Sequence, residues 1–474
     1  MNPILQMSAT DIARKIRQRD LSPVEVVEAH IQRIEAVNPA INAVVTPMFD
    51  TARESAQAAQ AHIEAEGTDN LPPLLGVPVT IKDCWAVKDV RFTGGSWYRR
   101  DTIAEKDAEA VTLLRDAGAI ILGKTNLPDM CWSAETMNPV FGQTNNPHNH
   151  KYSAGGSSGG EGAIIAAGGS ALGLGSDIAG SVRIPAAMNG CVALKPTGGR
   201  IPSEDHIPRP PDELLNWNTA GPMARRVEDL ALALKVLSRT PVQDYQEISL
   251  QARPCTVYIH NGVAPVHKSV ADTVTTAMTS LKSAGMATHR DDTLPLPELL
   301  YLYFGIFRKL GNPAFKQALG GGNAYSLWRE SLRSLFGNGR ISRRVLFFTT
   351  SVDFIGLYAS LRYKLDTFEK LAKLRQQILD SMGEGGVILC PIIITPPPKH
   401  GWTWTIARQP AYSIMFNALE FPTVVLPIGY NAQGLPMAVQ IVARPGEDEV
   451  ALAVAAELEC VYGGWQMAMG QADT

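Results

Sequence analysis

The stretch from Ala154 to Arg183 combines glycines with serine hydroxyls and reads AGGSSGGEGAIIAAGGSALGLGSDIAGSVR. Two of its serines, Ser157 and Ser181, each stand among small residues. Small residues before Ser181 could turn successive backbone N–H groups inward as an anion-binding nest. A hydroxyl beside such a nest offers what acyl transfer requires, namely a nucleophile and donors for a developing oxyanion.

Phosphate-binding motifs do not fit this stretch. A P-loop needs a lysine after its glycines, and none follows here. A dinucleotide fingerprint fails because Gly173, Gly175 and Gly180 have the wrong final spacing. The nucleophile-elbow pattern G-x-S-x-G fits when centred on Ser157 or on Ser158, although any glycine-serine cluster produces such a match.

A serine nucleophile also needs a base, and Lys82 is the candidate. It follows an apolar, β-branched run within LPPLLGVPVTIKD (Leu71 to Asp83), which predicts a buried strand. A lysine acts as a base only when neutral, a form that desolvation favours. From spacing alone, a salt bridge between Lys82 and Asp83 at the end of the strand is the simpler interpretation.

The elements that would position these residues alternate between helix and strand, which indicates an α/β layered fold. Capping patterns at Ser8 and Ser22 predict helices in the first part of the chain. Strands are expected over 119–122, 421–428 and 436–442. A long helix is expected to carry a core stripe consisting of Leu361, Leu365, Phe368, Leu371, Leu374 and Ile378.

Composition excludes several classes of protein. With 474 residues, 45% of them hydrophobic, the chain can build a full core. A net charge of −3 lacks the excess of basic residues that is typical of nucleic-acid-binding proteins. The six cysteines form no C-x-x-C, so their spacing indicates neither a disulfide scaffold nor a thiolate zinc site. Without a signal-peptide pattern or a stable membrane span, we expect a cytoplasmic protein.

Residues 301–363 are rich in aromatic and basic side chains and predict a lid or pocket wall. Phe304 and Trp328 are its candidate substrate contacts, with Trp402 and Cys131 as further wall candidates. The basic side chains of this segment could also touch an anionic surface. The plainer alternatives are that the aromatics are ordinary core, the charges a solvated face and Cys131 a small buried residue.

Taken together, these motifs are highly specific. The chain resembles the amidase signature family of serine hydrolases over nearly its whole length, most strongly over 75–83, 123–126, 155–162 and 173–197. The resemblance implies one domain, 1–474, built on a large twisted mixed β-sheet with helices on both faces. Its parts would be a helical N-terminal part (1–65), a catalytic core (71–240), the variable aromatic segment (301–363) and C-terminal strands and helix (385–474).

The resemblance also implies a Ser–cisSer–Lys triad. Ser181 would be the acylated nucleophile, and Ser157, after a cis peptide from Gly156, would bridge it to Lys82. The implied oxyanion hole consists of the backbone N–H groups of Ile178, Ala179, Gly180 and Ser181, with alanine at 179 where many members have glycine. The implied supporting residues are Ser158, Asp177 and Arg183. No metal or organic cofactor is implied.

Within the family, Glu161-Gly162 after the serine pair is similar to fatty-acid-amide-hydrolase-type members. We therefore expect cleavage of an amide, anilide or carbamate bond, and of esters as well, in a hydrophobic or aryl small molecule. The A subunit of a tRNA-dependent amidotransferase is an alternative. Whether the chain forms a homodimer stays open.

Two further alternatives have different chemistry. The first is an α/β-hydrolase-like esterase with Ser157 or Ser158 as nucleophile and a later acid and base, for which Asp353 and His400 are candidates. The second is a scaffold that keeps the fold without turnover, although a scaffold has no need of Lys82, Ser157 and Ser181 together.

Overall fold

The computed structural model describes residues 2–68, 70–260, 262, 264–322, 326–336, 339–363, 367–403 and 412–468. The helices are α1 (Ala9–Arg17), α2 (Pro23–Ile41), α3 (Phe49–Glu66), α4 (Glu109–Asp116), α5 (Gly159–Ala166), α6 (Arg183–Asn189), α7 (Val227–Leu237), α8 (Lys268–Ser283), α9 (Leu296–Leu319), α10 (Leu327–Leu335), α11 (Arg343–Tyr363), α12 (Phe368–Met382), α13 (Ile414–Ala418) and α14 (Asp448–Tyr462). Short 3₁₀ helices are η1 (Pro3–Gln6), η2 (Trp97–Arg99), η3 (Asp129–Cys131), η4 (Asp212–Trp217) and η5 (Tyr245–Glu247).

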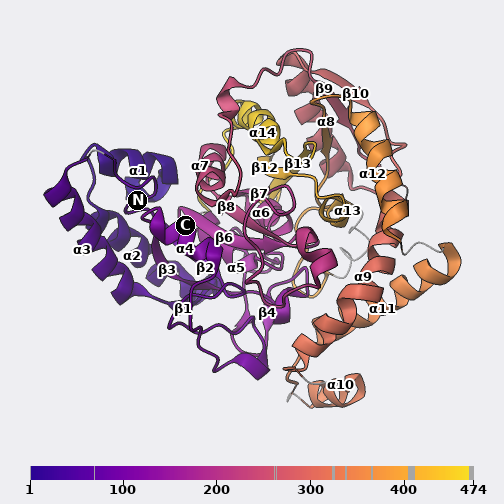
Figure 1. Ribbon diagram of the computed structural model, residues 1–474, viewed down its shortest axis with the longest axis horizontal. Coiled ribbons are helices and arrows are strands. Elements are labelled where there is room, and N and C mark those ends of the chain that lie inside the picture. The colour runs from indigo at the N-terminus through magenta and orange to yellow at the C-terminus, as the bar shows by residue number, and fades with distance from the viewer. Residues whose placement is uncertain are drawn as a thin grey trace.

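The strands are β1 (Val44–Pro47), β2 (Pro78–Lys82), β3 (Ile120–Thr125), β4 (Met137–Asn138), β5 (Gly142–Gln143), β6 (Leu172–Asp177), β7 (Val192–Lys195), β8 (Thr219–Ala224), β9 (Pro254–Val257), β10 (Ala287–Arg290), β11 (Val387–Cys390), β12 (Thr423–Tyr430) and β13 (Pro436–Val442). Among the described residues, eleven of them form one sheet in the order β1-β3-β2-β6-β8-β7-β12-β13-β11-β9-β10. The sheet is mixed, since β2 is parallel to both β3 and β6 while β6 and β8 are antiparallel. The α/β fold with a large mixed sheet is confirmed (Figure 1).

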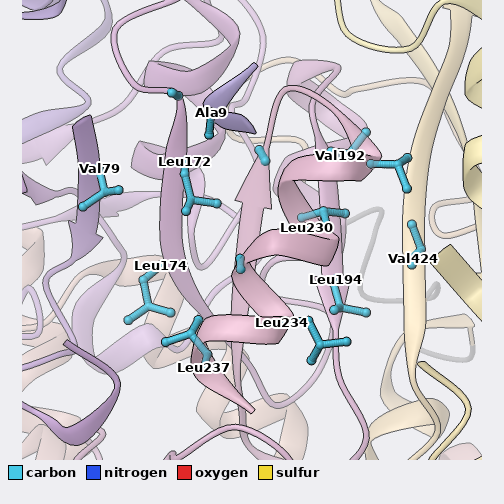
Figure 2. Packing of buried hydrophobic residues seen from close by; sticks show 14 of the residues in the cluster. Ala9, Val79, Leu172, Leu174, Val192, Leu194, Leu230, Leu234, Leu237 and Val424 are labelled. Atoms are coloured by element: carbon cyan, nitrogen blue, oxygen red, sulfur yellow. The ribbon is translucent and has the colours of Figure 1, made fainter. Parts of the chain in front are cut away.

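Helix α7 covers one face of this sheet. Its Leu230, Leu234 and Leu237 recur at helical spacing and are buried. Figure 2 shows α7 in front of β7 and β8, with Leu230 and Leu234 near Val192 and Leu194 of β7 and Leu237 near Leu174 of β6. Leu172 and Leu174 of β6 belong to the same buried cluster. Because side chains alternate along a strand, the intervening residues of β6 point to the other face.

Those intervening residues, Gly173 and Gly175, let α5 approach the sheet closely. A Cβ atom on Gly173 would lie 2.1 Å from Oε2 of Glu161, and one on Gly175 would lie 2.9 Å from Oγ of Ser158. Any larger residue would push α5 and the serine pair before it away from the sheet. The glycine pattern therefore fixes the depth at which Ser157 and Ser158 lie.

Helices α2 and α3 pack against β3 at the indigo end of Figure 1, while α1 packs against α7. Ser8 and Ser22 cap α1 and α2, accepting hydrogen bonds from the backbone N–H groups of Asp11 and Glu25 at 2.9 and 3.0 Å. Both predicted helix starts are confirmed.

The segment 301–363 forms most of α9 together with α10 and α11, and α11 packs along α9. Among the described helices, α11 is the one that could cross a membrane by length and composition, and 33% of its window Arg343–Leu361 is buried. A single helix of this kind is weak evidence for a span, because core helices of globular proteins pass the same test.

Candidate active site

Lys82 ends β2 and is fully buried. Its Nζ donates to Oγ of Ser157 at 2.7 Å and to Oγ of Ser176 at 2.9 Å. The salt bridge between Lys82 and Asp83, the simpler interpretation of the sequence, is wrong. Asp83 instead pairs with Lys124 of β3 at 2.8 Å, and both side chains are buried. Among the described residues, the hydrogen-bond partners of Lys82 are thus hydroxyl oxygens and no carboxylate.

The two serine segments lie side by side. The Gly156–Ser157 peptide bond is cis, and α5 starts two residues after Ser157. The backbone N–H of Ser158 donates to the carbonyl of Ser181 at 3.0 Å. Oγ of Ser158 lies 3.4 Å from both the backbone N and O of Ser176, so this side chain ties the helix start to β6.

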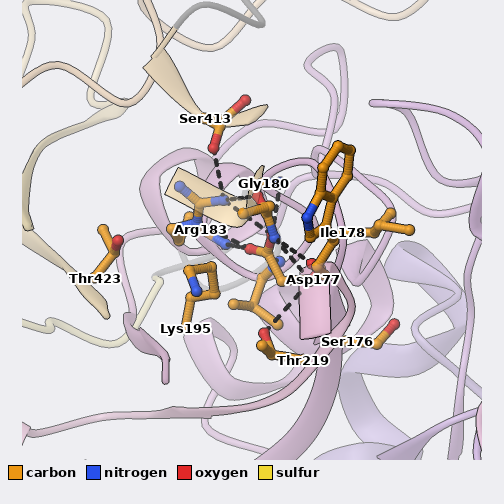
Figure 3. Close-up of polar contacts among 12 residues, drawn as sticks. Ser176, Asp177, Ile178, Gly180, Arg183, Lys195, Thr219, Ser413 and Thr423 are labelled. Atoms are coloured by element: carbon orange, nitrogen blue, oxygen red, sulfur yellow. Dashed lines mark hydrogen bonds and ion pairs between the residues drawn. The ribbon is translucent and has the colours of Figure 1, made fainter. Parts of the chain in front are cut away.

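Asp177, the last residue of β6, organises the turn that carries Ser181. Its carboxylate accepts from the backbone N–H of Gly180 at 2.7 Å and of Val182 at 3.1 Å, and pairs with Arg183 at 2.9 Å. Figure 3 shows this network, which extends to Ser413 through Arg183. Burial acts to raise the pKa of Asp177, but the charge and hydrogen bonds of Arg183 outweigh it and hold that pKa well below its usual range. The turn is therefore held around an ionised carboxylate.

The backbone N–H groups of the turn divide into two sets. Gly180 donates to Asp177 and is not among the residues that line the cavity. Ile178, Ala179 and Ser181 do line it, and within the described part of the chain their N–H groups have no protein acceptor. Three of the four N–H groups predicted for the oxyanion hole can therefore donate to a ligand in the cavity. The fourth, that of Gly180, donates to Asp177 and stabilises the turn.

Ser181 lies at a cavity of about 430 Å³. Apolar and aromatic side chains form most of its wall, and polar groups come from the serine turns and from two arginines of α11. The lining includes Cys131, Trp132, Gly156, Ile178, Ala179, Ser181, Tyr303, Phe304, Arg343, Arg344, Phe347, Phe348 and Ser413. A small number of polar groups in an apolar cavity is typical of sites for apolar small molecules.

Two of the four side chains predicted to form the pocket wall line the cavity, and two do not. Cys131 and Phe304 are buried and line this cavity. Trp328 on α10 is 76% exposed and Trp402 is 57% exposed, and neither belongs to the lining. Tyr303, another aromatic of the segment 301–363, also lines the cavity and donates its hydroxyl to the carbonyl of Ile178 at 3.1 Å.

Glu161 is a buried carboxyl that spacing alone did not assign a role. It accepts from the hydroxyls of Thr80 at 2.5 Å and Thr125 at 2.7 Å. Burial raises its pKa to about 7. Glu161 thereby links α5 to β2 and β3 directly behind Ser157 and Lys82.

Ser176 and His206 extend the hydrogen bonds of Lys82, and sequence reasoning missed both. Nε2 of His206 lies 2.9 Å from Oγ of Ser176, and its Nδ1 lies 2.9 Å from the carbonyl of Pro208. Because a carbonyl oxygen only accepts, Nδ1 is the nitrogen that donates to Pro208, and Nε2 faces the hydroxyl of Ser176. Ser176 adjoins the quoted Asp177 turn, but nothing in the spacing pointed to His206.

The acid and base of the esterase alternative have other partners. Nδ1 of His400 is 2.9 Å from Oε1 of Glu135, which also pairs with Arg344. Asp353 pairs with Lys316 and Asn312 of α9. Among the described contacts, neither reaches Ser157 or Ser158, so the geometry gives this alternative no base for its serine.

Comparisons with known proteins agree with this architecture. The model of the Amidase family matches residues 25–452. The chain is 34% identical to fatty-acid amide hydrolase 2 of Homo sapiens, over 98% of this chain and 90% of that protein. It is 32% identical to an acylamidase of Rhodococcus erythropolis, over 96% and 95% of the two chains. The structure of 6-aminohexanoate cyclic dimer hydrolase with its substrate superposes with a TM-score of 0.78 at 27% identity, covering 98% and 99%. The chain therefore belongs to the amidase family of hydrolases, the amidase signature enzymes, which act on amides.

Proposed function

We propose that this amidase cleaves the carboxamide-type C–N bond of hydrophobic or aryl substrates through a Ser–cisSer–Lys triad and an acyl-enzyme. The observation that carries the proposal is the 2.7 Å hydrogen bond between Nζ of Lys82 and Oγ of Ser157, beside the cavity that Ser181 lines. Amides, anilides and carbamates are the expected substrates, with esters as a further class, since all pass through a tetrahedral oxyanion.

In the acylation step, Oγ of Ser181 attacks the substrate carbonyl while Ser157 takes its proton and passes its own to neutral Lys82. The N–H groups of Ile178, Ala179 and Ser181 would stabilise the oxyanion. Each such donor is worth about 10²–10³ in rate in serine hydrolases. When the C–N bond breaks, the proton held by Lys82 returns through Ser157 to the leaving nitrogen. Water then hydrolyses the acyl-enzyme with the same groups as base.

The lining of the cavity supports the choice of substrate. Phe304, Phe347 and Phe348 offer apolar area, and Cys131 and Trp132 close the same wall. By their names, the relatives fatty-acid amide hydrolase 2 and acylamidase act on acyl amides. A hydrophobic acyl or aryl group would lie against these side chains.

A substrate panel on purified Ser181→Ala, Ser157→Ala and wild-type protein tests the proposal. We expect wild type to hydrolyse long-chain and aryl acyl anilides better than the acetyl anilide. We expect Ser181→Ala to have no turnover and Ser157→Ala to lose most of its kcat. Retained turnover in Ser181→Ala would contradict the assigned nucleophile. A preference for small polar amides would contradict the substrate class.

A further inference from the structure

Three side chains from distant parts of the sequence meet beside Lys82. Cys84 follows β2, Cys131 ends η3, and His206 lies in the loop before the cis Ile207–Pro208 bond. Their Sγ, Sγ and Nε2 atoms all lie within 4.8 Å of one another, and all three side chains are buried. We call this group the Cys84–Cys131–His206 cluster.

The ring of His206 already has the form that a metal ligand needs. Its Nδ1–H donates to the carbonyl of Pro208, so Nε2 is the ring nitrogen directed at Ser176 and Cys131. A ligating histidine typically donates its other ring N–H to a carbonyl or carboxylate, which fixes the tautomer and the ring orientation. Pro208 is thus the outer partner that such a site requires.

The spacing suits a thiophilic ion. Around tetrahedral zinc, bond lengths of about 2.3 Å to sulfur and about 2.0–2.1 Å to nitrogen place a sulfur and a nitrogen ligand roughly 3.6 Å apart. Sγ of Cys131 and Nε2 of His206 are 3.8 Å apart. Two sulfurs and an imidazole nitrogen favour zinc and other soft cations over magnesium or calcium, which prefer oxygen.

The cluster is also connected to the reaction site. Oγ of Ser176 lies 3.4 Å from Sγ of Cys84 and 2.9 Å from both Nε2 of His206 and Nζ of Lys82. Cys131 lines the substrate cavity, so an ion can reach the cluster from there. An ion held by the cluster would take Nε2 of His206 away from Ser176 and fill the inner wall beside Ser181.

We propose that Cys84, Cys131 and His206 bind one thiophilic divalent cation, and that the bound ion inhibits the enzyme. On binding, the two thiols lose two protons to solvent and form two metal–sulfur bonds, while neutral Nε2 provides the third ligand. Inhibition arises because Ser176 loses the acceptor that orients it toward Lys82 and because the ion narrows the cavity. The inhibitory part rests on the proposed hydrolase function, whereas the binding part does not.

The test uses Co²⁺ and Zn²⁺ on the full chain carrying Cys460→Ser, which removes an exposed thiol, without oxygen and with a phosphine reductant. We expect one Co²⁺ per chain, with thiolate charge-transfer absorption and the visible bands of a tetrahedral ion, and displacement by Zn²⁺. Cys84→Ala and His206→Gln should each weaken binding roughly 100-fold or more, because each removes a ligand of the ion. Cys255→Ala, a buried cysteine of β9 outside the cluster, should leave binding unchanged.

Activity supplies the second measurement. Zn²⁺ should lower wild-type turnover, excess substrate should protect, and a chelator should restore activity. Cys84→Ala should lose this sensitivity relative to its own metal-free rate. If circular dichroism shows that one ligand variant is unfolded, the other ligand variant is used to measure the loss of metal binding and of inhibition.

The absence of thiolate absorption, or an affinity in both ligand variants that equals the wild-type affinity, would overturn the site. Inhibition that a reductant reverses and a chelator does not would point to a Cys84–Cys131 disulfide and would also overturn it. Binding by a chain that hydrolyses no amide would refute the proposed function and leave the metal site standing.

Discussion

Nζ of Lys82 and Oγ of Ser157 are joined by a 2.7 Å hydrogen bond, although the two residues are 75 positions apart in the sequence. Parallel pairing of β2 with β6 brings the end of β2 to the start of α5, and the glycines of β6 let α5 lie close enough for the contact. In the described part of the chain, Lys82 has no carboxylate partner, because Asp83 pairs with Lys124. Lys82 is therefore placed to exchange a proton with the hydroxyl of Ser157.

Replacing Lys82 tests this role. Lys82→Ala should lower kcat by about 10²–10⁴-fold, the usual contribution of a positioned general base. His400→Ala provides the control, because His400 binds Glu135 and should leave kcat within a few-fold of wild type. Steady-state kinetics of both variants on one anilide substrate shows whether Lys82 or His400 acts as the base. Loss of activity in His400→Ala together with an active Lys82→Ala would favour the esterase alternative.

Asp177 should matter for both stability and rate. Asp177→Asn leaves the buried guanidinium of Arg183 without its carboxylate partner, and breaking such an ion pair costs about 3–5 kcal/mol. The same change weakens the hold on Gly180 and Val182, so kcat should fall even where the variant is folded. Urea denaturation and kinetics measure the two effects. An unchanged free energy of unfolding would show that the ion pair between Asp177 and Arg183 does not stabilise the turn before Ser181.

Glu161 should make stability depend on pH. Its pKa is raised from 4.5 to about 7 in the folded chain, so the folded carboxyl stays protonated where the unfolded one ionises. The stability it contributes is complete below pH 4.5, declines as the pH rises toward 7 and is lost above that. A shift of this size corresponds to about 3 kcal/mol. Glu161→Gln should remove this decline.

Urea denaturation of both proteins at pH 4.5 and pH 8 provides the comparison. Burial raises the pKa of Asp129 to about 7 as well, so the difference between variant and wild type is the quantity to follow. An identical pH dependence in the two proteins would contradict a buried, protonated Glu161.

Phe304 and Trp328 should differ in their effect on substrate choice. Phe304→Ala removes a buried wall of the cavity and should lower the kcat/KM ratio of long to short acyl anilides by roughly tenfold. Trp328→Ala removes an exposed side chain outside the lining and should leave this ratio unchanged. The ratio is insensitive to the folded fraction, which keeps the comparison valid if Phe304→Ala is less stable.

Local patterns predicted much of the fold. The strand expected over 436–442 is β13, and those expected over 119–122 and 421–428 overlap β3 and β12 within a few residues. β-Branched runs bounded by turn residues determine these strands locally. The prediction of one long helix from Leu361 to Ile378 was wrong, because α11 ends at Tyr363 and α12 begins at Phe368. Leu361 is 75% exposed and not core, and Leu365 lies outside the described residues.

Site residues that belong to a sequence motif could be predicted from the sequence. Site residues that meet only through tertiary contacts could not. Lys82, Ser157 and Ser181 were found because glycine-rich segments and the family resemblance mark them. The partner of Asp83 is Lys124, on the neighbouring strand β3, and no local spacing reveals such a pairing. Likewise, Cys84, Cys131 and His206 lie far apart in the sequence and meet only through the packing of three loops.

Covalent labelling with a hydrophobic fluorophosphonate, followed by mass-spectrometric mapping of the labelled peptide, shows whether Ser181 is the nucleophile and whether Lys82 activates it. We expect label on Ser181 in wild type and in His400→Ala, and loss of that label at neutral pH in Lys82→Ala. Label on Ser157 or Ser158, or full labelling of Ser181 without Lys82, would contradict this expectation.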